Sequence, residues 1–556
     1  MWQNAIAEAG PIGFTTGGAQ DIENFRQNLN ESYLPVVSDI TFTGIIKDYY
    51  FDTSGNQNQT CTELFCPIYS VGLSQPPALV QAADGPQNFS DSPADLYLAV
   101  GLDSGIQDFA RKKLNLVILI DVSGSMSSPF DSYYYDSMGA TVYLTPEEQN
   151  KTKMDVAKEA VNGILDRLTP DDRVGIVLFS DSACVGLRLG RVGCLNRETL
   201  KQTIQSEVQP LASTNMGAGV NLSVSALRGC AECMRSDPED WENRVIVLTD
   251  AEVNAGQTEA DGILGYLEDA AEDRIFFTFV GIGEFHTRVV DQFDYLVTPL
   301  AFDLTLEIQS AEGLGSARGW RMLQMYGSND STLSTDGTLM RVPTLFPSPK
   351  DADSAIRGGV LLVRLKAPDG PAVPLQILAR YWDRQSFGSG GAGKRVEKTL
   401  DAAALAALSS SDVSTYQSSG VRKAILLARY TDMLRSWLVD QWALVGSGSV
   451  PLPADLCNAG FPTLFCPGPI LEPLGYGNCQ LSRWVGPGAC ILPVPEPIAR
   501  ELGQWERTSA PLQVAPEAKA AFRQFLPYFT QEARAIGDET LRREIATLQQ
   551  LIAAPE

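Results

Sequence analysis

The chain carries oxygen-bearing side chains at places where a predicted strand ends or a predicted helix begins. They are Asp121, Ser123, Ser125, Thr214 and Asp250. The first three form a D-x-S-x-S loop directly after the apolar run 114–120. Carboxylate and hydroxyl oxygens are hard donors that suit Mg²⁺, Ca²⁺ or Mn²⁺ and not soft metals. The pattern therefore predicts a divalent-cation site, most simply for Mg²⁺, with Ca²⁺ and Mn²⁺ as alternatives.

Such a site supplies few negative charges to the cation, because only two of the five donors are carboxylates. Mg²⁺ in particular keeps several waters in its octahedral shell. An acidic group of a ligand can take one of these positions, which is a mechanism for cation-dependent adhesion. The competing interpretation is a polar loop whose Ser, Thr and Asp residues only cap helices.

The elements that must position these donors alternate between strands and helices. The predicted strands are 114–120, 172–183, 244–250 and 274–283, and the predicted helices are 154–168, 198–208, 214–229 and 259–273. This alternation predicts a doubly wound, mostly parallel α/β sheet of the Rossmann-like kind over 112–300. Ligands of such sheets collect at the carboxyl ends of the strands, where Asp121 and Asp250 fall.

Three segments carry a resemblance to a known family. DVSGSM (121–126), STNMGAG (213–219) and LTDAEVN (248–254) resemble the metal-ion-dependent adhesion site of von Willebrand factor A domains. Ala251 stands where that family often has Gly, which changes no ligand. Segments over about 13–445 also resemble bacterial proteins labelled Ca-activated chloride-channel-like. That label implies no channel here, because no run approaches the roughly 18–20 apolar residues of a membrane helix.

The remaining segments surround this domain. We predict a mostly β region at 1–111, a β-rich domain at 301–419, an amphipathic helix at 420–445, a Cys/Pro/Gly-rich segment at 446–497 and a helical tail at 498–556. Strand-like runs occur at 39–46 and 96–102 before the domain, and at 302–309, 359–366 and 375–382 after it. We expect them to pair as a β-sandwich into which the α/β domain is inserted, or which flanks it.

A long insertion emerges beside the predicted cation site, between Met126 and the helix at 154. Its tyrosines and the single histidine are candidates for a partner surface: Tyr133, Tyr134, Tyr135, Tyr143 and His286. Tyrosine gives a large contact area at low entropic cost. The alternative is a lid packed on its own domain, or a disordered loop.

The cysteines predict an oxidising compartment. All ten occur as close pairs: Cys61/Cys66, Cys184/Cys194, Cys230/Cys233, Cys457/Cys466 and Cys479/Cys490. An even number in local pairs is typical of small-loop disulfides in extracellular proteins. Six Asn-x-Ser/Thr sequons permit glycosylation, and no signal peptide is visible at the N-terminus. We expect an extracellular or cell-surface protein in a mature or clipped form.

Composition narrows the class of partner. Hydrophobic residues make up 44% and charged residues 20% of the 556 residues, as in folded soluble proteins. The net charge of −24 disfavours nucleic acid and anionic membranes and favours cations.

GSGGAGK (388–394) lacks the Ser/Thr of a phosphate-binding loop, since Arg395 follows. The CxxC at 230–233 has no second pair at zinc-ligand spacing and is expected to be structural. The pair Asp171-Asp172 is interpreted as a solvated turn.

These observations favour a non-enzymatic binding protein that engages protein or acidic glycan ligands through the cation. A structural glycoprotein of a coat or filament, which self-associates through the same site, is the first alternative. An enzymatic or chaperone-like role in a metal-insertion or ATPase complex is the second, and it would require an intracellular chain with reduced cysteines.

Overall fold

The computed structural model describes most of the chain. The described residues are 12–16, 22–30, 32–54, 61–75, 95–107, 109–127, 134–135, 141–142, 151–211, 215–237, 240–250, 266–267, 269–281, 293–310, 320–327, 338–351, 353–366, 374–384, 386–387, 393–400, 414–445, 474–476, 479–481 and 510–555. They form two compact units. The inserted unit comprises 111–298 and 450–509, and the split unit comprises 1–110, 299–449 and 510–556.

The inserted unit is built on a sheet of five described strands in the order β11-β10-β5-β8-β9. They are β5 (Lys113–Asp121), β8 (Arg173–Phe179), β9 (Ala183–Arg191), β10 (Trp241–Thr249) and β11 (Ile275–Gly281). All neighbours are parallel except β9, which runs antiparallel to β8 at the edge. The predicted α/β sheet is thus confirmed, with β9 as an edge strand that the sequence did not predict.

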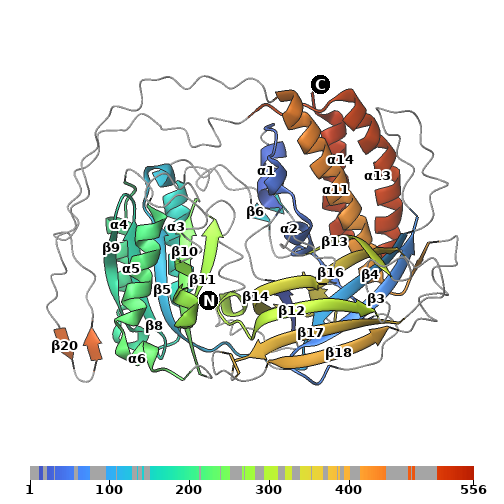
Figure 1. Cartoon of the computed structure of the whole chain (residues 1–556). Helices are drawn as coiled ribbons and strands as arrows, with labels where there is room; N and C mark the ends of the chain where they lie inside the picture. Colours follow the sequence, from blue (N-terminus) through green and yellow to red (C-terminus); the bar gives the residue numbers. More distant parts are fainter. Residues whose placement is uncertain are drawn as a thin grey trace. The chain divides into compact units, whose positions relative to one another are not determined.

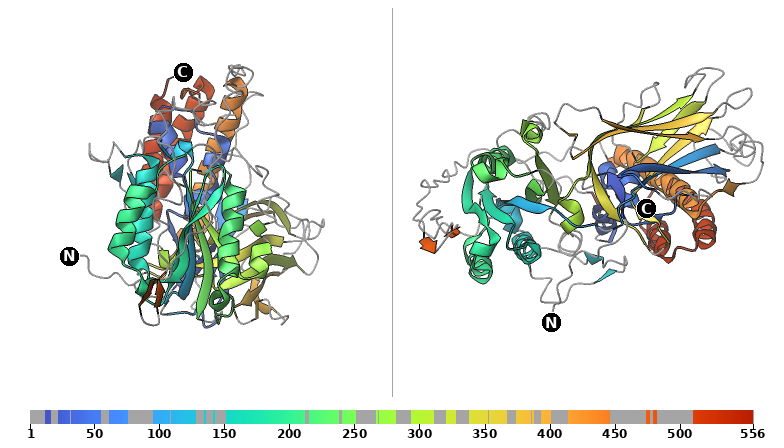
Figure 2. Two further views of the ribbon diagram at one scale, coloured as in Figure 1. Left: turned by 90° about the vertical axis from the view of Figure 1, so that its left-hand side faces the viewer. Right: turned by 90° about the horizontal axis from the view of Figure 1, so that it is seen from below.

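Helices cover both faces of this sheet (Figures 1 and 2). They are α3 (Lys153–Arg167), α4 (Arg197–Glu207), α5 (Met216–Arg228), α6 (Ala231–Met234) and α9 (Phe293–Leu296). Alternate side chains of β5 enter different cores: Ile118 packs with residues of α3 and α4, whereas Leu119 packs with residues of α5. Gly219 permits the close approach of α5, since a Cβ there would lie 2.9 Å from Leu119 Cδ1. Burial on both faces explains why the centre of β5, residues 116–120, is a continuous apolar run.

A buried ion pair lies at the amino-terminal end of β5. Asp172 is fully buried and accepts hydrogen bonds from Arg111 at 2.6 and 3.1 Å and from the Leu114 N–H at 2.8 Å. The Thr169 N–H and hydroxyl donate to the same carboxylate at 2.6 and 2.9 Å. The interpretation of Asp171-Asp172 as a solvated turn is therefore wrong for Asp172. Its buried carboxylate joins Arg111, the Leu114 backbone and Thr169. Asp171 is exposed, as expected.

The split unit contains a sheet of ten described strands, all paired antiparallel. They are β1 (Ile12–Thr16), β3 (Cys66–Ser74), β4 (Asp95–Asp103), β12 (Ala301–Ser310), β13 (Arg321–Tyr326), β14 (Thr338–Pro349), β16 (Val360–Lys366), β17 (Leu375–Asp383), β18 (Lys394–Leu400) and β19 (Thr415–Tyr416). Strands from either side of the insertion pair, β4 with β16 and β1 with β14. Hydrogen bonds join these strands into one sheet, where the sequence analysis expected the two sheets of a sandwich.

Helices pack together in the split unit (Figure 1). They are α1 (Glu23–Asn30), α2 (Phe42–Ile46), α11 (Ser419–Val445), α13 (Pro516–Ile536) and α14 (Arg542–Ala553). The predicted strand at 39–46 is wrong. The Thr41 hydroxyl accepts the Gly44 N–H at 2.9 Å and caps α2, whose five residues are all buried. A short apolar run does not distinguish a strand from a buried helix.

Buried charges connect the ends of the chain within the split unit. Arg26 of α1 contacts Glu544 of α14 at 2.5 Å and Asp48 at 2.9 Å. The Tyr49 hydroxyl donates to the same Glu544 carboxylate at 2.8 Å. Because each of these charges has a close partner, the N-terminal segment and the C-terminal helices are held by matched electrostatic contacts.

The remaining described elements are short. β2 (Tyr50–Phe51) pairs with β15 (Ile356–Arg357), β6 (Tyr134–Tyr135) with β7 (Thr141–Val142), and β20 (Leu474–Tyr476) with β21 (Cys479–Leu481). The short helices are η1 (Val37–Asp39), η3 (Gly124–Ser127), η5 (Val192–Cys194) and η7 (Glu539–Leu541). Within the described part of the chain, no helix has the length and apolarity required to cross a bilayer.

Disulfides join Cys61 to Cys66 and Cys230 to Cys233. Cys194 is also disulfide-bonded, but the predicted pairing of Cys184 with Cys194 is not among the disulfides that join described residues. Cys184 lies near the start of the extended strand β9 and Cys194 in η5 after its end, and a rise of about 3.3 Å per residue along β9 separates them by more than the roughly 7 Å that a disulfide spans. Cys479 begins β21, and Cys457, Cys466 and Cys490 lie outside the described residues.

Candidate metal centre

The site begins where the central strand β5 ends. Asp121 is the last residue of β5 and is fully buried, and Ser123 is 1% exposed. Ser125 lies in η3, which follows at once. Because β5 has neighbours on both sides, its carboxyl end is reached by the loops that follow β8 and β10. The sheet topology thus brings residues distant in sequence to one edge.

Local hydrogen bonds fix the Asp121 carboxylate. The Ser123 N–H donates to its Oδ1 at 2.8 Å, and the Thr249 hydroxyl donates to its Oδ2 at 2.6 Å. The hydroxyl oxygens of Ser123 and Ser125 lie 3.0 Å apart. One carboxylate and two hydroxyls therefore gather in the D-x-S-x-S loop, as the spacing predicts. Thr249 is a neighbour that sequence reasoning missed, although it stands directly before Asp250.

Asp250 follows β10, and its side chain is 2% exposed. Its Oδ2 accepts a hydrogen bond from Lys153, the first residue of α3, at 3.1 Å. Its Oδ1 is buried and accepts no hydrogen bond from the described residues. A buried carboxylate oxygen without a partner is costly, and a cation would satisfy it. Lys153 is a second neighbour that the sequence analysis did not single out.

The electrostatics also fit a cation. Burial, with a smaller contribution from the charge of Asp250, raises the pKa of Asp121 to about 6, against the lowering effect of hydrogen bonds from Thr249 and Ser123. The carboxylates of Asp121 and Asp250 thus repel each other across a buried region. A divalent cation between them would offset this repulsion, and the oxygen donors present are those that Mg²⁺, Ca²⁺ and Mn²⁺ accept.

Thr214, the fifth predicted ligand, lies outside the described residues, but its neighbour is well placed. The Asn215 N–H donates to the Ser180 carbonyl at 2.5 Å, and its side chain accepts the Ala218 N–H at 3.1 Å, capping α5. These bonds anchor the start of α5 to the loop after β8. Since β8 is the direct neighbour of β5, the start of α5 lies at the same edge of the sheet as Asp121.

No cluster of three or more His, Cys, Asp or Glu residues suited to a metal occurs among the residues that the structure describes. The candidate site therefore depends on serine and threonine hydroxyls as well as on its two carboxylates. The candidate partner residues lie mostly outside the described structure. Tyr134 and Tyr135 form β6, of which only the backbone is described, and Tyr133, Tyr143 and His286 lie outside the described residues.

Comparison with known proteins places this domain in a family. Residues 116–252 match the model of the von Willebrand factor type A domain, a range that contains all five predicted ligands. No curated protein matches the chain significantly.

Solved structures of the same type are similar to parts of the chain. A von Willebrand factor type A protein from Catenulispora acidiphila has 12% identity and a TM-score of 0.30, over 62% of this chain and 75% of that one. An ArnB paralogue from Sulfolobus acidocaldarius has 11% identity and a TM-score of 0.28, over 68% and 86%. Proximal thread matrix protein 1 from the mussel byssus, solved with a zinc-occupied MIDAS motif, has 18% identity and a TM-score of 0.23, over 34% and 42%.

The family match and the sheet of the inserted unit agree. Residues 116–252 form a von Willebrand factor type A domain, and their D-x-S-x-S loop lies at the carboxyl end of β5.

Proposed function

We propose that the chain binds a divalent cation through Asp121, Ser123, Ser125, Thr214 and Asp250, and that the bound cation captures an acidic group of a protein or glycan ligand. The observation that carries this proposal is the buried Oδ1 of Asp250, which accepts no hydrogen bond from the described residues, in a site with a second buried carboxylate. Two adjacent carboxylates in a buried site favour a cation as their common partner.

The chain's own residues prepare this site. Asp121 is held by Thr249 and by the backbone of Ser123, so its carboxylate is ordered before the cation arrives. The cation would supply a Lewis-acidic position that a ligand carboxylate completes. The other three donors are neutral hydroxyls, so the two carboxylates do no more than balance the charge of a divalent cation, and the cation can still accept an oxygen of the ligand as a Lewis acid. Mg²⁺ is the first expectation, with Ca²⁺ and Mn²⁺ as alternatives.

We propose a binding role without catalysis. The site offers carboxylate and hydroxyl oxygens that could ligate a metal. Histidine is the most frequent general base in enzymes, and the chain has a single histidine, His286. We also propose a location outside the cytosol. The disulfides Cys61–Cys66 and Cys230–Cys233 support this, because disulfides persist mainly in oxidising compartments.

Selection of a displayed peptide library on Mn²⁺-loaded full-length protein tests this function. We expect enriched peptides to contain aspartate or glutamate, and binding to be lost with EDTA or when the acid is replaced by its amide. Peptides that bind equally well in EDTA contradict the proposal. Self-association of the cation-loaded protein, reversed by EDTA in sedimentation experiments, would instead assign the site to assembly of identical chains.

A further inference from the structure

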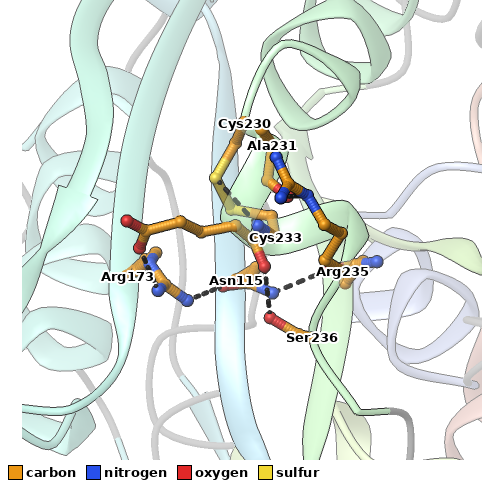
Figure 3. Close-up of a disulfide and its surroundings, with 9 residues drawn as sticks. Asn115, Arg173, Cys230, Ala231, Cys233, Arg235 and Ser236 are labelled. Carbon is orange, nitrogen blue, oxygen red and sulfur yellow. Dashed lines mark hydrogen bonds and ion pairs between the residues drawn. A yellow bond between two sulfur atoms is a disulfide. The ribbon is translucent and has the colours of Figure 1, made fainter.

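A second feature with chemistry of its own lies in the inserted unit, in the loop between α5 and β10. Cys230 and Cys233 form a disulfide within the short helix α6 (Figure 3). Cys230 is partly exposed, whereas Cys233 is 1% exposed. The Cys233 N–H donates to Cys230 Sγ at 3.2 Å. One cysteine of the pair is thus partly exposed, with its sulfur hydrogen-bonded, and the other cysteine is buried.

The turn that holds these cysteines is fixed by contacts other than the disulfide. Glu232, between them, forms an ion pair with Arg173 of β8 at 2.7 Å, and its carbonyl accepts the Ser236 hydroxyl at 2.7 Å. The Met234 N–H donates to the Cys230 carbonyl at 3.1 Å. Arg173 is itself held by Asn115 of β5 at 2.9 Å. The loop is therefore expected to keep its shape when the disulfide opens.

This disulfide also contributes little to the fold as a covalent link. Its two cysteines are three residues apart, so it closes a very small loop. Constraint of the unfolded chain grows with the length of the loop that a disulfide closes, and it is smallest for loops of this size. A purely structural role therefore leaves both the accessibility of Cys230 and the short spacing without a physical reason.

We propose that Cys230–Cys233 is a thiol–disulfide exchange site whose co-substrate is a dithiol, either a small molecule or a protein. The first sulfur attacked is Cys230 Sγ, because an attacking thiolate requires access. The hydrogen bond from the Cys233 N–H stabilises the Cys230 thiolate when it forms. Short Cys-x-x-Cys pairs are the arrangement in which such exchange is common.

The exchange takes place in two steps. A thiolate of the dithiol forms a bond to Cys230 Sγ, the bond between Cys230 and Cys233 breaks, and Cys233 leaves as a thiolate that takes a proton from water. The second thiol of the co-substrate then loses its proton and attacks the co-substrate sulfur that is bonded to Cys230. This step closes the co-substrate disulfide and releases the Cys230 thiolate, which is then protonated. The protein disulfide is reduced by two electrons, and the dithiol is oxidised to a disulfide.

The test is equilibration of the folded full-length protein with defined ratios of reduced and oxidised glutathione. Differential alkylation and mass spectrometry then give the reduced fraction of each disulfide. Cys61–Cys66 of the same molecule is the internal reference. We expect Cys230–Cys233 to reach half reduction at a glutathione ratio about tenfold less reducing than Cys61–Cys66 requires. Equal behaviour of the two, or reduction of Cys230–Cys233 only after unfolding in urea, would overturn the proposal.

Single-cysteine variants test which sulfur is attacked. Cys233→Ser leaves the accessible Cys230, and Cys230→Ser leaves the buried Cys233. With oxidised glutathione, Cys233→Ser should form a mixed disulfide about tenfold faster than Cys230→Ser. Equal rates in two folded variants contradict the assignment. If either variant fails to fold, the glutathione titration of the unaltered protein still decides the proposal.

Discussion

The Nζ of Lys153 lies 3.1 Å from Oδ2 of Asp250, so a side chain of the domain places a positive charge against a proposed metal ligand. Lys153 begins α3 and is 27% exposed, whereas Asp250 is 2% exposed. The lysine therefore offsets the charge of Asp250 through Oδ2. The other oxygen of the same carboxylate, Oδ1, accepts no hydrogen bond from the described residues.

A bound divalent cation and this lysine would repel each other. Lys153→Met retains the aliphatic stem but removes the charge, and we expect it to strengthen Mg²⁺ or Mn²⁺ binding by about tenfold, as measured by titration calorimetry. Lys151→Met is the matched control, because Lys151 pairs with the more exposed Glu159. A variant at position 153 with unchanged or weaker cation affinity contradicts the proposed position of the metal beside Asp250.

The buried pair of Arg111 and Asp172 gives a prediction about stability. Asp172→Asn should lower the free energy of unfolding by about 3 kcal/mol, because it removes one of the two carboxylates that pair with the Arg111 guanidinium and disrupts the hydrogen bonds that Asp172 accepts. Asp294, at 2.8 Å, is then the remaining counter-charge of Arg111. Urea unfolding measures this loss. Asp171→Asn is the control at the adjacent position, where the carboxylate is 68% exposed, and it should change stability by less than about 1 kcal/mol. Equal effects of the two variants would show that burial of Asp172 does not stabilise the domain.

A pH dependence follows from Asp538 in the split unit. Burial alone would raise the pKa of this carboxyl, but the Lys423 ammonium at 2.6 Å and hydrogen bonds from Thr540 outweigh it and lower the pKa. A group with a lowered folded pKa stabilises the fold above its unfolded pKa of about 3.9 and loses that effect as the pH falls through the folded value.

Asp538→Asn should therefore destabilise the protein at neutral pH and progressively less below about pH 4. Urea midpoints of both proteins between neutral and acidic pH measure the difference. Glu539→Gln, at a neighbouring exposed carboxylate, should show no such trend. A difference that stays constant with pH contradicts the assigned role of the Lys423–Asp538 pair.

The sequence was sufficient to predict the sheet of the inserted unit. β5 contains a continuous apolar run because both faces of a parallel sheet are covered, and such a run can be recognised in the sequence. The edge strand β9 was missed because its alternation includes Gly and Arg, as in a half-exposed strand. The five-residue helix α2 was mistaken for a strand, since all its residues are buried and its pattern has no polar face.

The ligand motif could be predicted because D-x-S-x-S is local, whereas its supporting contacts join distant residues. Thr249 bonds to Asp121, and Lys153 to Asp250, across 128 and 97 positions of sequence. The burial of Asp172 was equally invisible, because its partner Arg111 precedes it by 61 positions. The hydrogen-bond partners of a buried carboxylate depend on which strands are neighbours in the sheet. A local sequence pattern does not reveal that strand order.

Titration calorimetry of the EDTA-stripped full-length protein with Mg²⁺, Ca²⁺, Mn²⁺ and Zn²⁺ tests the central claim most directly. It is repeated on Asp121→Ala and on Asp166→Ala, whose carboxylate is 60% exposed on α3. We predict one cation per chain for the unaltered protein and for Asp166→Ala, and no binding for Asp121→Ala, whose circular dichroism should stay that of a folded protein. Binding by a folded Asp121→Ala variant equal to that of the unaltered protein, or no binding by either, would contradict the claim that this site holds a metal.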